Sequence, residues 1–272
     1  MPKPSADDPT GPLYVNYATA PGSPFQGIPS TQPEGERAAN ADLTAALTNS
    51  LIPSAELIEN LGLYLDRSAL SHILFIHDLY KRILPVHGVI LEFGARWGRN
   101  LALFAELRNI YEPRNFLRRI VGFDTFEGFP GVSAADGSAP GVTTGAYSVE
   151  PGYEQHLTAL LRTHEQFGFR PNLLKHEIVK GDLVQTLPDY IDRHPETIVA
   201  LAYFDLDLFE GTAGALQVIG DRLVRGSVVA FDELCMQQFP GETQALLETW
   251  GLRQLKLRRT PLSYGESFVV LE

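Results

Sequence analysis

The sequence has little of what several protein classes require. It contains one cysteine, Cys235, in 272 residues, which excludes an internal disulfide and a zinc site built from several thiolates. We expect Cys235 to be a small buried apolar residue. The longest apolar stretches, such as residues 198–204, are far shorter than the roughly 20 residues that cross a membrane, and no signal-peptide pattern opens the chain. We therefore expect a cytoplasmic protein without a membrane partner.

Basic residues are also scarce. The 22 lysines and arginines are outnumbered by 33 aspartates and glutamates, which gives a formal net charge of −11. A charge of this sign repels a phosphate backbone, so we do not expect nucleic acid as a partner. Hydrophobic residues make up 44% of the chain and charged residues 20%, as in ordinary globular proteins. The length suits one large domain with an appendage.

Proline and glycine are concentrated near the N-terminus. Residues 1–35 contain eight of the 19 prolines, a composition that predicts an extended arm. Between residues 36 and 84 apolar residues recur at helical spacing, which predicts a helical preface of two or three helices that ends before Pro85. Residues 85–272 are the predicted main domain.

Short β-rich runs alternate with amphipathic stretches after Pro85. The alternation predicts an α/β fold in which helices cover both faces of a mostly parallel sheet. The runs expected to be strands are residues 88–93, 120–124, 177–180, 198–205 and 227–232. The expected helices are residues 100–110, 153–167, 183–193, 213–223 and 242–250. A closing antiparallel hairpin is expected from residues 254–257 and 267–271.

The ends of the first three predicted strands carry features of a ligand site. In open α/β sheets ligands bind beyond the carboxyl ends of the strands. Glu92 closes the first strand, and Gly94 and Gly98 follow in a turn where the absent Cβ lets a ligand approach the backbone. Asp124 and Asp182 follow the next two strands. Together the carboxylates suit a cationic nucleoside such as S-adenosylmethionine better than a pyrophosphate, although each alone could equally cap a helix or end a turn.

Carboxylates also follow the fourth and fifth predicted strands. Asp205 and Asp207 end the fourth and point the same way if the strand stays extended, and Asp232 and Glu233 end the fifth. Converging carboxylates repel one another unless a cation is present, and an all-oxygen shell suits magnesium, calcium or manganese. We favour magnesium. Ordinary polarity at solvent-facing strand ends is the alternative, and the seven scattered histidines are not expected to be ligands.

Five segments within residues 88–233 resemble class I S-adenosylmethionine-dependent methyltransferases. They are LEFGARWGRN, GFDTFEGFP, VKGDLVQTLPDYI, YFDLDLFEGT and VVAFDE. Their order is similar to that of the macrocin O-methyltransferase family, whose members modify sugars in antibiotic biosynthesis, and to its branch that acts on nucleotide-linked deoxysugars in enediyne pathways. The resemblance implies a Rossmann-like fold with a mostly parallel seven-stranded sheet.

The resemblance also implies which residues bind the cofactor and a metal ion. The residues implied to surround S-adenosylmethionine are Glu92, Gly94, Ala95, Gly98, Asn100, Asp124, Thr125 and Asp182. Those implied to hold Mg²⁺ are Asp205, Asp232 and Glu233. The chain departs from the pattern of these relatives at two places. Many relatives have an aspartate in place of Glu233, and Arg96 and Trp97 are unusual in the first turn.

These observations predict methyl transfer to a deoxysugar hydroxyl, the sugar being nucleotide-linked or attached to a natural product. Two vicinal hydroxyls chelated by a cation would be oriented and acidified together, and Asp205 is assigned both as a metal ligand and as the base. Residues 125–149 lack periodicity, so we expect a loop that selects the acceptor, with Tyr147 as its aromatic surface. The N-terminal arm suggests a homo-oligomer.

Three alternatives stay open at this point. An NAD-dependent oxidoreductase would use the same sheet, but the third glycine of GxGxxG and a Tyr-x-x-x-Lys pair are missing. A catechol-type O-methyltransferase would use the same metal chemistry on another vicinal diol. A non-catalytic binding module is supported only by the proline-rich arm.

Overall fold

The computed structural model describes residues 34–139, 141–263 and 265–272. By its internal contacts the chain divides into two compact units, residues 1–74 and 75–272. Most of the predicted arm, residues 1–33, lies outside the described residues. In the described part of the chain no helix combines the length and the apolar character needed to cross a membrane.

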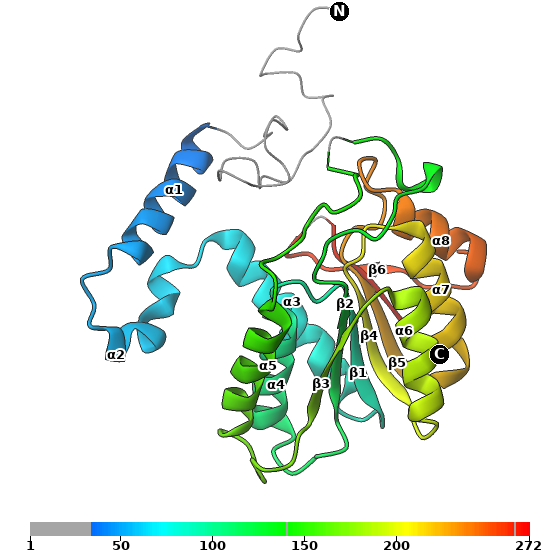
Figure 1. Ribbon diagram of the computed structural model, residues 1–272, viewed down its shortest axis with the longest axis horizontal. Helices are drawn as coiled ribbons and strands as arrows, with labels where there is room; N and C mark the ends of the chain where they lie inside the picture. The colour runs from blue at the N-terminus through cyan, green and yellow to red at the C-terminus, as the bar shows by residue number, and fades with distance from the viewer. Residues whose placement is uncertain (1–33, 140, 264) are drawn as a thin grey trace, which may run out of the picture. The chain divides into compact units, whose positions relative to one another are not determined.

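The first unit is helical, as its apolar spacing predicts. It contains α1 (Glu34–Thr48), α2 (Ser54–Leu57), the 3-10 helix η1 (Ile58–Tyr64) and the start of α3 (Arg67–Ile83) (Figure 1). Pro53 precedes α2, as expected of a residue that begins a helix more easily than it continues one. Ser50 and Tyr64 are joined through their hydroxyls at 2.7 Å. No residue of α1, α2 or η1 is buried.

The second unit is built on one seven-stranded sheet with the order β3-β2-β1-β4-β5-β7-β6. The strands are β1 (Val89–Phe93), β2 (Ile120–Asp124), β3 (His176–Lys180), β4 (Val199–Phe204), β5 (Leu223–Phe231), β6 (Arg258–Arg259) and β7 (Ser267–Val270). The first five are parallel, and β7 runs antiparallel to both β5 and β6. This confirms the predicted mostly parallel α/β fold.

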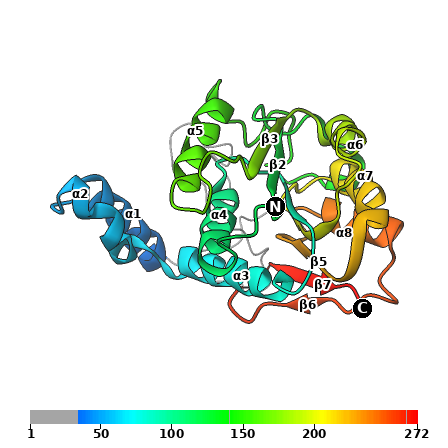
Figure 2. The ribbon, with the colours of Figure 1, turned by 90° about the horizontal axis from the view of Figure 1, so that it is seen from below.

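Helices cover both faces of this sheet. They are α4 (Arg99–Tyr111), α5 (Tyr153–Glu165), α6 (Leu183–Arg193), α7 (Phe209–Ile219) and α8 (Gly241–Thr249). Alternate residues of β1 enter different cores: Ile90 packs with α4 and α5, whereas Leu91 packs with α6, α7 and α8. Figure 2 shows these two groups of helices on opposite sides of the sheet. The central strands are apolar throughout because both of their faces are buried.

Several predicted boundaries are wrong for local reasons. The helix expected at residues 213–223 spans Phe209–Ile219; glycines at positions 211 and 214 conceal its first turn in the sequence. β5 begins at Leu223, four residues before the predicted start, because its first half is largely exposed and lacks an apolar run. The hairpin strand expected at residues 254–257 lies at Arg258–Arg259. Cys235 is exposed in a turn with φ +67°, so the prediction of a buried residue is wrong.

A buried cluster of charges joins α4, α5 and β3. The Glu165 carboxylate lies 3.0 Å from Arg108 Nη2, 2.6 Å from Lys175 Nζ and 3.0 Å from His176 Nδ1. Burial alone would raise the pKa of Glu165. Hydrogen bonds from His176 and Lys175 and the charges of Arg108 and Lys175 outweigh that effect and lower the pKa to about 2.

We expect Glu165→Gln to reduce the free energy of unfolding at pH 7 by ~3–5 kcal/mol, because it leaves buried cations without their counter-ion. The native pKa lies below the unfolded value, so this contribution is present above about pH 4.5 and is lost as pH falls toward 2. Urea unfolding of both proteins at pH 7, 4.5 and 3 measures it. Glu177→Gln is the control: it breaks a half-exposed pair with Arg119 and should cost less than about 1 kcal/mol. An equal cost for both variants would contradict the assignment.

The ends of β1 and β4 approach each other closely. Asp205 N donates to Phe93 O at 2.9 Å. Gly94, which follows Phe93, has φ +91°. A Cβ at Gly94 would overlap the backbone oxygen of Asp205. A glycine is therefore required here by two independent constraints, the left-handed backbone and the neighbouring strand.

We expect Gly94→Ala to destabilise the protein by about 2 kcal/mol or more, because the backbone of one strand end must move. Gly251→Ala is the matched control: Gly251 has φ +67°, but nothing lies within 4 Å of the added Cβ, so only the backbone strain of about 1 kcal/mol remains. Thermal unfolding of both variants makes the comparison. A Gly94→Ala protein as stable as Gly251→Ala would show that the close approach is unimportant.

Candidate active site

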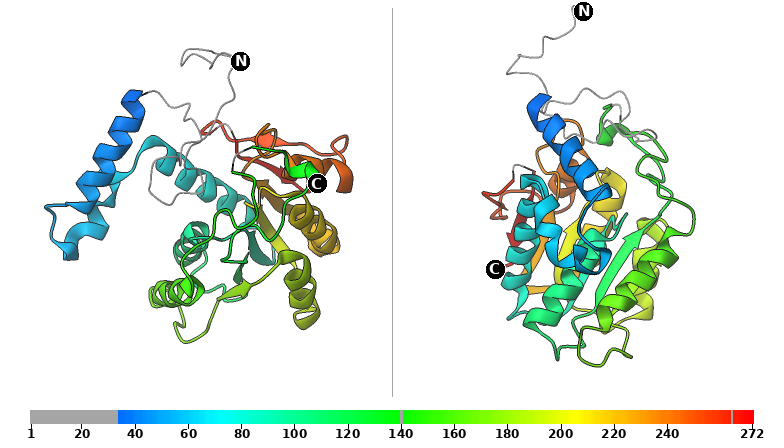
Figure 3. Two further views of the ribbon diagram at one scale, coloured as in Figure 1. Left: turned by 45° about the horizontal axis from the view of Figure 1, so that its top comes forward. Right: turned by 90° about the vertical axis from the view of Figure 1, so that its left-hand side faces the viewer.

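The carboxyl ends of β1 to β5 lie at one edge of the sheet because these strands are parallel. The segment that follows β2 returns across this edge. Its 3-10 helix η2 (Ala134–Asp136) contacts α8, as Figure 3 shows in green and orange. Asp136 is buried and accepts a hydrogen bond from Phe209 N at 2.5 Å. This bond ties the loop to the first residue of α7.

Glu92 lies at the centre of this edge and is 1% exposed. Burial raises the pKa of Glu92 to about 8, against the opposing effects of a hydrogen bond from Asn100 and the charge of Arg99. Its Oε2 atom is buried and has no hydrogen-bond partner among the described residues. Glu92 therefore presents an unsatisfied acceptor at the end of β1, where a cationic ligand would be stabilised.

Asp124 holds the turn between β1 and α4. Its Oδ2 accepts from Arg96 N at 2.7 Å and its Oδ1 from Phe126 N at 2.5 Å. Burial raises its pKa even though these bonds and the charge of Arg96 act in the opposite direction. Each carboxylate oxygen keeps a further lone pair for a ligand. Thr125 is used locally, since its Oγ1 donates to Gly128 O at 2.6 Å.

The other predicted cofactor residues have structural roles that differ from one another. Ala95 is buried, and its N–H donates to Phe123 O at 3.2 Å. Gly98 is the N-cap of α4 with φ +75°, a backbone conformation that favours glycine, and a Cβ there would force the Leu157 side chain to move. Asp182 caps α6 by accepting from Val184 N at 3.1 Å, the structural role that the sequence left open.

An acid cluster follows β4 and β5; it consists of Asp205, Asp207, Asp232, Glu233 and Glu242. Burial raises the pKa of Asp205 well above its usual range, and the charges of Asp232 and Asp207 add to this. Burial likewise raises the pKa of Glu233, and the charge of Asp207 adds to this. Buried carboxylates of like charge repel one another, so a cation bound among them would be stabilised.

The backbone of the acid cluster differs from the extended geometry that the sequence suggests. β4 ends at Phe204, and Asp207 has φ +63°. The prediction that Asp205 and Asp207 point the same way along a strand is therefore wrong. Asp207 is buried and is hydrogen-bonded to Glu233 and to Tyr147.

Glu242 is a member of the cluster that the sequence did not suggest. It lies in the first turn of α8, is fully buried, and its Oε1 accepts from Leu206 N at 3.1 Å. Burial raises the pKa of Glu242 to about 8, and its Oε2 has no partner among the described residues. Only the tertiary fold brings α8 to the β4 end, so no local motif announces this residue.

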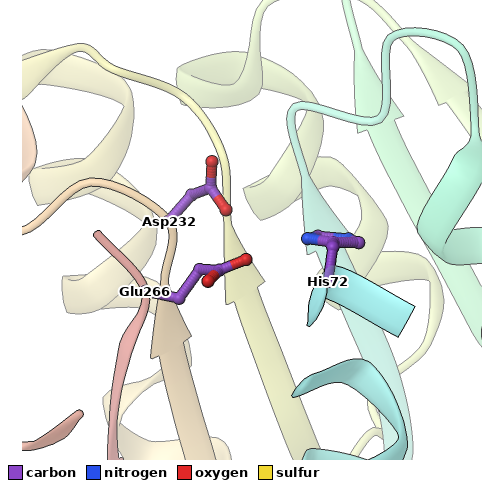
Figure 4. Close-up of side chains that lie close together, drawn as sticks. All are labelled: His72, Asp232 and Glu266. Atoms are coloured by element: carbon purple, nitrogen blue, oxygen red, sulfur yellow. The ribbon is translucent and has the colours of Figure 1, made fainter. Parts of the chain in front are cut away.

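Asp232 has a hydrogen-bond donor and a second carboxylate close to it. The Tyr203 hydroxyl donates to Asp232 Oδ1 at 2.7 Å. A carboxylate oxygen of Glu266, which precedes β7, lies within 4.8 Å of one of Asp232; Figure 4 shows the two groups together. His72, also drawn there, belongs to the first unit. In the described chain the predicted ligands Asp205, Asp232 and Glu233 do not bring one oxygen each within 4.8 Å of one another.

The donor chemistry nevertheless fits a divalent cation. The acid cluster offers only oxygen atoms, and Oε2 of Glu233 and Oε2 of Glu242 are buried without a hydrogen-bond partner in the described part of the chain. Orphaned buried carboxylate oxygens are costly unless a cation or proton neutralises them. Hard cations such as Mg²⁺ prefer such ligands.

Comparisons with known proteins show what the chain as a whole is similar to. No family model matches the chain, and no curated protein matches it. Among solved structures, CalS11, a calicheamicin methyltransferase, is 43% identical over 88% of this chain and 93% of its own, with a TM-score of 0.86. Apo CalS11, described as a TDP-rhamnose 3'-O-methyltransferase, is 40% identical over 88% and 95%, with a TM-score of 0.78. The O-methyltransferase NovP, 17% identical over 74% and 80% with a TM-score of 0.55, shares the fold.

The likeness to CalS11 confirms the resemblance that the five sequence segments carry. It favours a methyltransferase over an oxidoreductase or a non-catalytic module, since identity of this degree extends over most of both chains. The chain belongs to the family of S-adenosylmethionine-dependent O-methyltransferases that includes CalS11.

Proposed function

We propose that the protein methylates a hydroxyl of a nucleotide-linked deoxysugar in secondary metabolism, with TDP-rhamnose as the model acceptor. The observation that carries this proposal is the 40–43% identity to CalS11 over 88% of the chain, because TDP-rhamnose is the sugar named for that protein. The acid cluster, together with the turn between β1 and α4, is consistent with a reaction between a sulfonium cofactor and a hydroxyl. A catechol acceptor would use similar carboxylates, but no feature of the described residues favours it.

The cofactor would lie against the ends of β1 to β3. The adenosine ribose hydroxyls would donate to the free lone pairs of Asp124, and the backbone beside Gly94 would accommodate the methionine end. Glu92, held by Asn100, would attract the positive sulfonium and ammonium groups. Ala95, Gly98 and Thr125 would shape the turn, and Asp182 would approach the adenine from the N-terminus of α6.

We expect Asp124→Asn to weaken S-adenosylhomocysteine binding about tenfold or more, because it removes a charged acceptor from the ribose. Isothermal titration calorimetry measures the affinity, and a thermal unfolding curve without ligand shows whether the fold is intact. Asp189→Asn is the control, since it removes an acidic residue from α6 away from the strand ends. Unchanged affinity in a folded Asp124→Asn protein would contradict the proposed ribose contact.

Asp205, Asp232 and Glu233 would hold a Mg²⁺ ion. When bound, the ion supplies Lewis-acid activation and orients vicinal hydroxyls. Tyr203 fixes Asp232 through the 2.7 Å hydrogen bond, and Glu242 fixes the turn after β4 by accepting from Leu206 N. Asp205 would take the proton from the acceptor hydroxyl onto its carboxylate, close to the cofactor side of the cluster, since Glu92 is among its charged neighbours.

Methylation of TDP-rhamnose by S-adenosylmethionine tests the function directly. We expect turnover to fall at least tenfold in EDTA and to return with excess Mg²⁺, and Asp205→Asn to lower kcat about 100-fold with S-adenosylhomocysteine affinity changed less than threefold. Glu210→Gln, an exposed carboxylate in the first turn of α7, should leave kcat unchanged. Undiminished turnover in EDTA would remove the metal, and a parent-like Asp205→Asn would remove the base. Absence of any methylated sugar would overturn the proposed acceptor.

Three other features stay predictions. The homo-oligomer is consistent with exposed apolar side chains in the first unit: Leu51, between α1 and α2, is 100% exposed, and Ile58, on η1, is 80% exposed. The cytoplasmic location rests on the sequence alone. The division into an arm of residues 1–35, a helical preface of residues 36–84 and a methyltransferase domain of residues 85–272 also stays a prediction.

A further inference from the structure

Arg96 lies between the turn that would hold the cofactor and the loop that would face the acceptor. Its backbone belongs to the turn: φ is +44° and its N–H donates to Asp124 Oδ2 at 2.7 Å. An arginine is an uncommon choice for a left-handed position that glycine would occupy without strain. The contacts of its side chain therefore indicate why an arginine occupies this position.

The guanidinium group of Arg96 lies on aromatic rings. Its Cζ is 5.0 Å from the ring centre of Tyr147 and 5.6 Å from that of Trp97. Trp97 in turn packs edge-on against Tyr153, at 4.8 Å between ring centres. Arg96 Nε is buried without a hydrogen-bond partner in the described part of the chain. Its contacts with the two rings therefore stabilise the position of the group.

Tyr147 connects this contact to the loop and to the acid cluster. Its ring packs on Phe129 at 5.0 Å between centres, and Phe129 N donates to Ala146 O at 2.9 Å, which joins the two arms of the loop. The Tyr147 hydroxyl is hydrogen-bonded to Asp207. A continuous path of contacts therefore runs from Asp124 through Arg96 and Tyr147 to Asp207.

Two carboxylates already oppose the charge of Arg96. Its positive charge lowers the pKa values of Asp124 and Asp207 against the raising effect of burial. A guanidinium group whose charge already acts on two carboxylates is a weak candidate to bind the phosphates of an acceptor. It is well placed to join the two carboxylate regions.

We propose that Arg96 is a positioning residue that couples cofactor binding to the ordering of residues 126–149 and thereby to acceptor binding. This inference rests on the proposed function. A nucleoside that engages Asp124 and the 94–98 backbone fixes the Arg96 main chain, and the fixed guanidinium then holds Tyr147. Because coupling between two sites is reciprocal, the acceptor would also strengthen cofactor binding.

Hydrogen exchange of the intact protein, with and without S-adenosylhomocysteine, tests the coupling without an acceptor. In the parent protein we expect the ligand to slow exchange in both residues 94–100 and residues 126–149. In Arg96→Met and in Tyr147→Leu the slowing at residues 126–149 should fall about fivefold, while that at residues 94–100 persists. Arg96→Lys should restore part of the effect, since it keeps the charge but not the planar group. Arg114→Met, which removes an exposed arginine outside both segments, should behave like the parent.

Steady-state kinetics with TDP-rhamnose supply the second measurement. Arg96→Met and Tyr147→Leu should each raise the KM for TDP-rhamnose about fivefold or more, with a smaller change in kcat, and the double variant should be no worse than either single variant. Multiplicative effects in the double variant would overturn the coupling. Loop protection that persists in both single variants would do the same.

The outcomes separate this inference from the proposed function. A parent protein in which S-adenosylhomocysteine protects residues 94–100 but leaves residues 126–149 unchanged contradicts the coupling, while the methyltransferase activity stands. A parent protein that shows the loop protection but does not methylate TDP-rhamnose supports the coupling and contradicts the proposed acceptor.

Discussion

Burial of negative charge at the carboxyl edge of the sheet is the constraint on which the rest of the site depends. Burial raises the pKa values of Glu92 and Glu242 to about 8 and that of Asp205 well above its usual range. A protein without ligands maintains such an arrangement only at a cost, because each ionised carboxylate has lost its solvent. Cationic ligands would remove that cost, so burial of these carboxylates favours the binding of a cation, as the proposed function requires.

Buried charges elsewhere in the second unit are paired within the protein, unlike those at the carboxyl ends of the strands. Where β3 begins, Glu165 is surrounded by Arg108, Lys175 and His176, and Arg118 donates to the carbonyl oxygens of Ile83, Val86 and Gly88. Those charges are satisfied within the protein and serve the fold. At the acid cluster, by contrast, the carboxylates raise one another's pKa values, and the opposing charge is that of Arg96. In the described part of the chain, one buried carboxylate oxygen of Glu233 and one of Glu242 have no hydrogen-bond partner.

The sequence predicted the sheet well because buried central strands are continuous apolar runs, as in β1 and β4. It predicted α7 poorly because glycines conceal the first turn, which is stabilised from a distance by Asp136. The carboxylates at strand ends were recognisable, since a strand end is a local feature. Glu242 was not, because α8 reaches the β4 end only in the folded chain. The orientation of Asp207 depends on a left-handed backbone that no residue pattern specifies.

Three residues that the sequence resemblance marks as unusual are connected by contacts in the structure. They are Arg96 and Trp97 in the turn after β1, and Glu233 after β5. In the structure Glu233 is hydrogen-bonded to Asp207, Asp207 to Tyr147, and the Tyr147 ring lies beneath the Arg96 guanidinium group. Arg96 thus contacts the Tyr147 ring directly, and Glu233 is connected to Tyr147 through Asp207. One path of contacts therefore joins the turn after β1, the loop that carries Tyr147 and the acid cluster, so the unusual residues at its two ends are explained together by their connection to that loop.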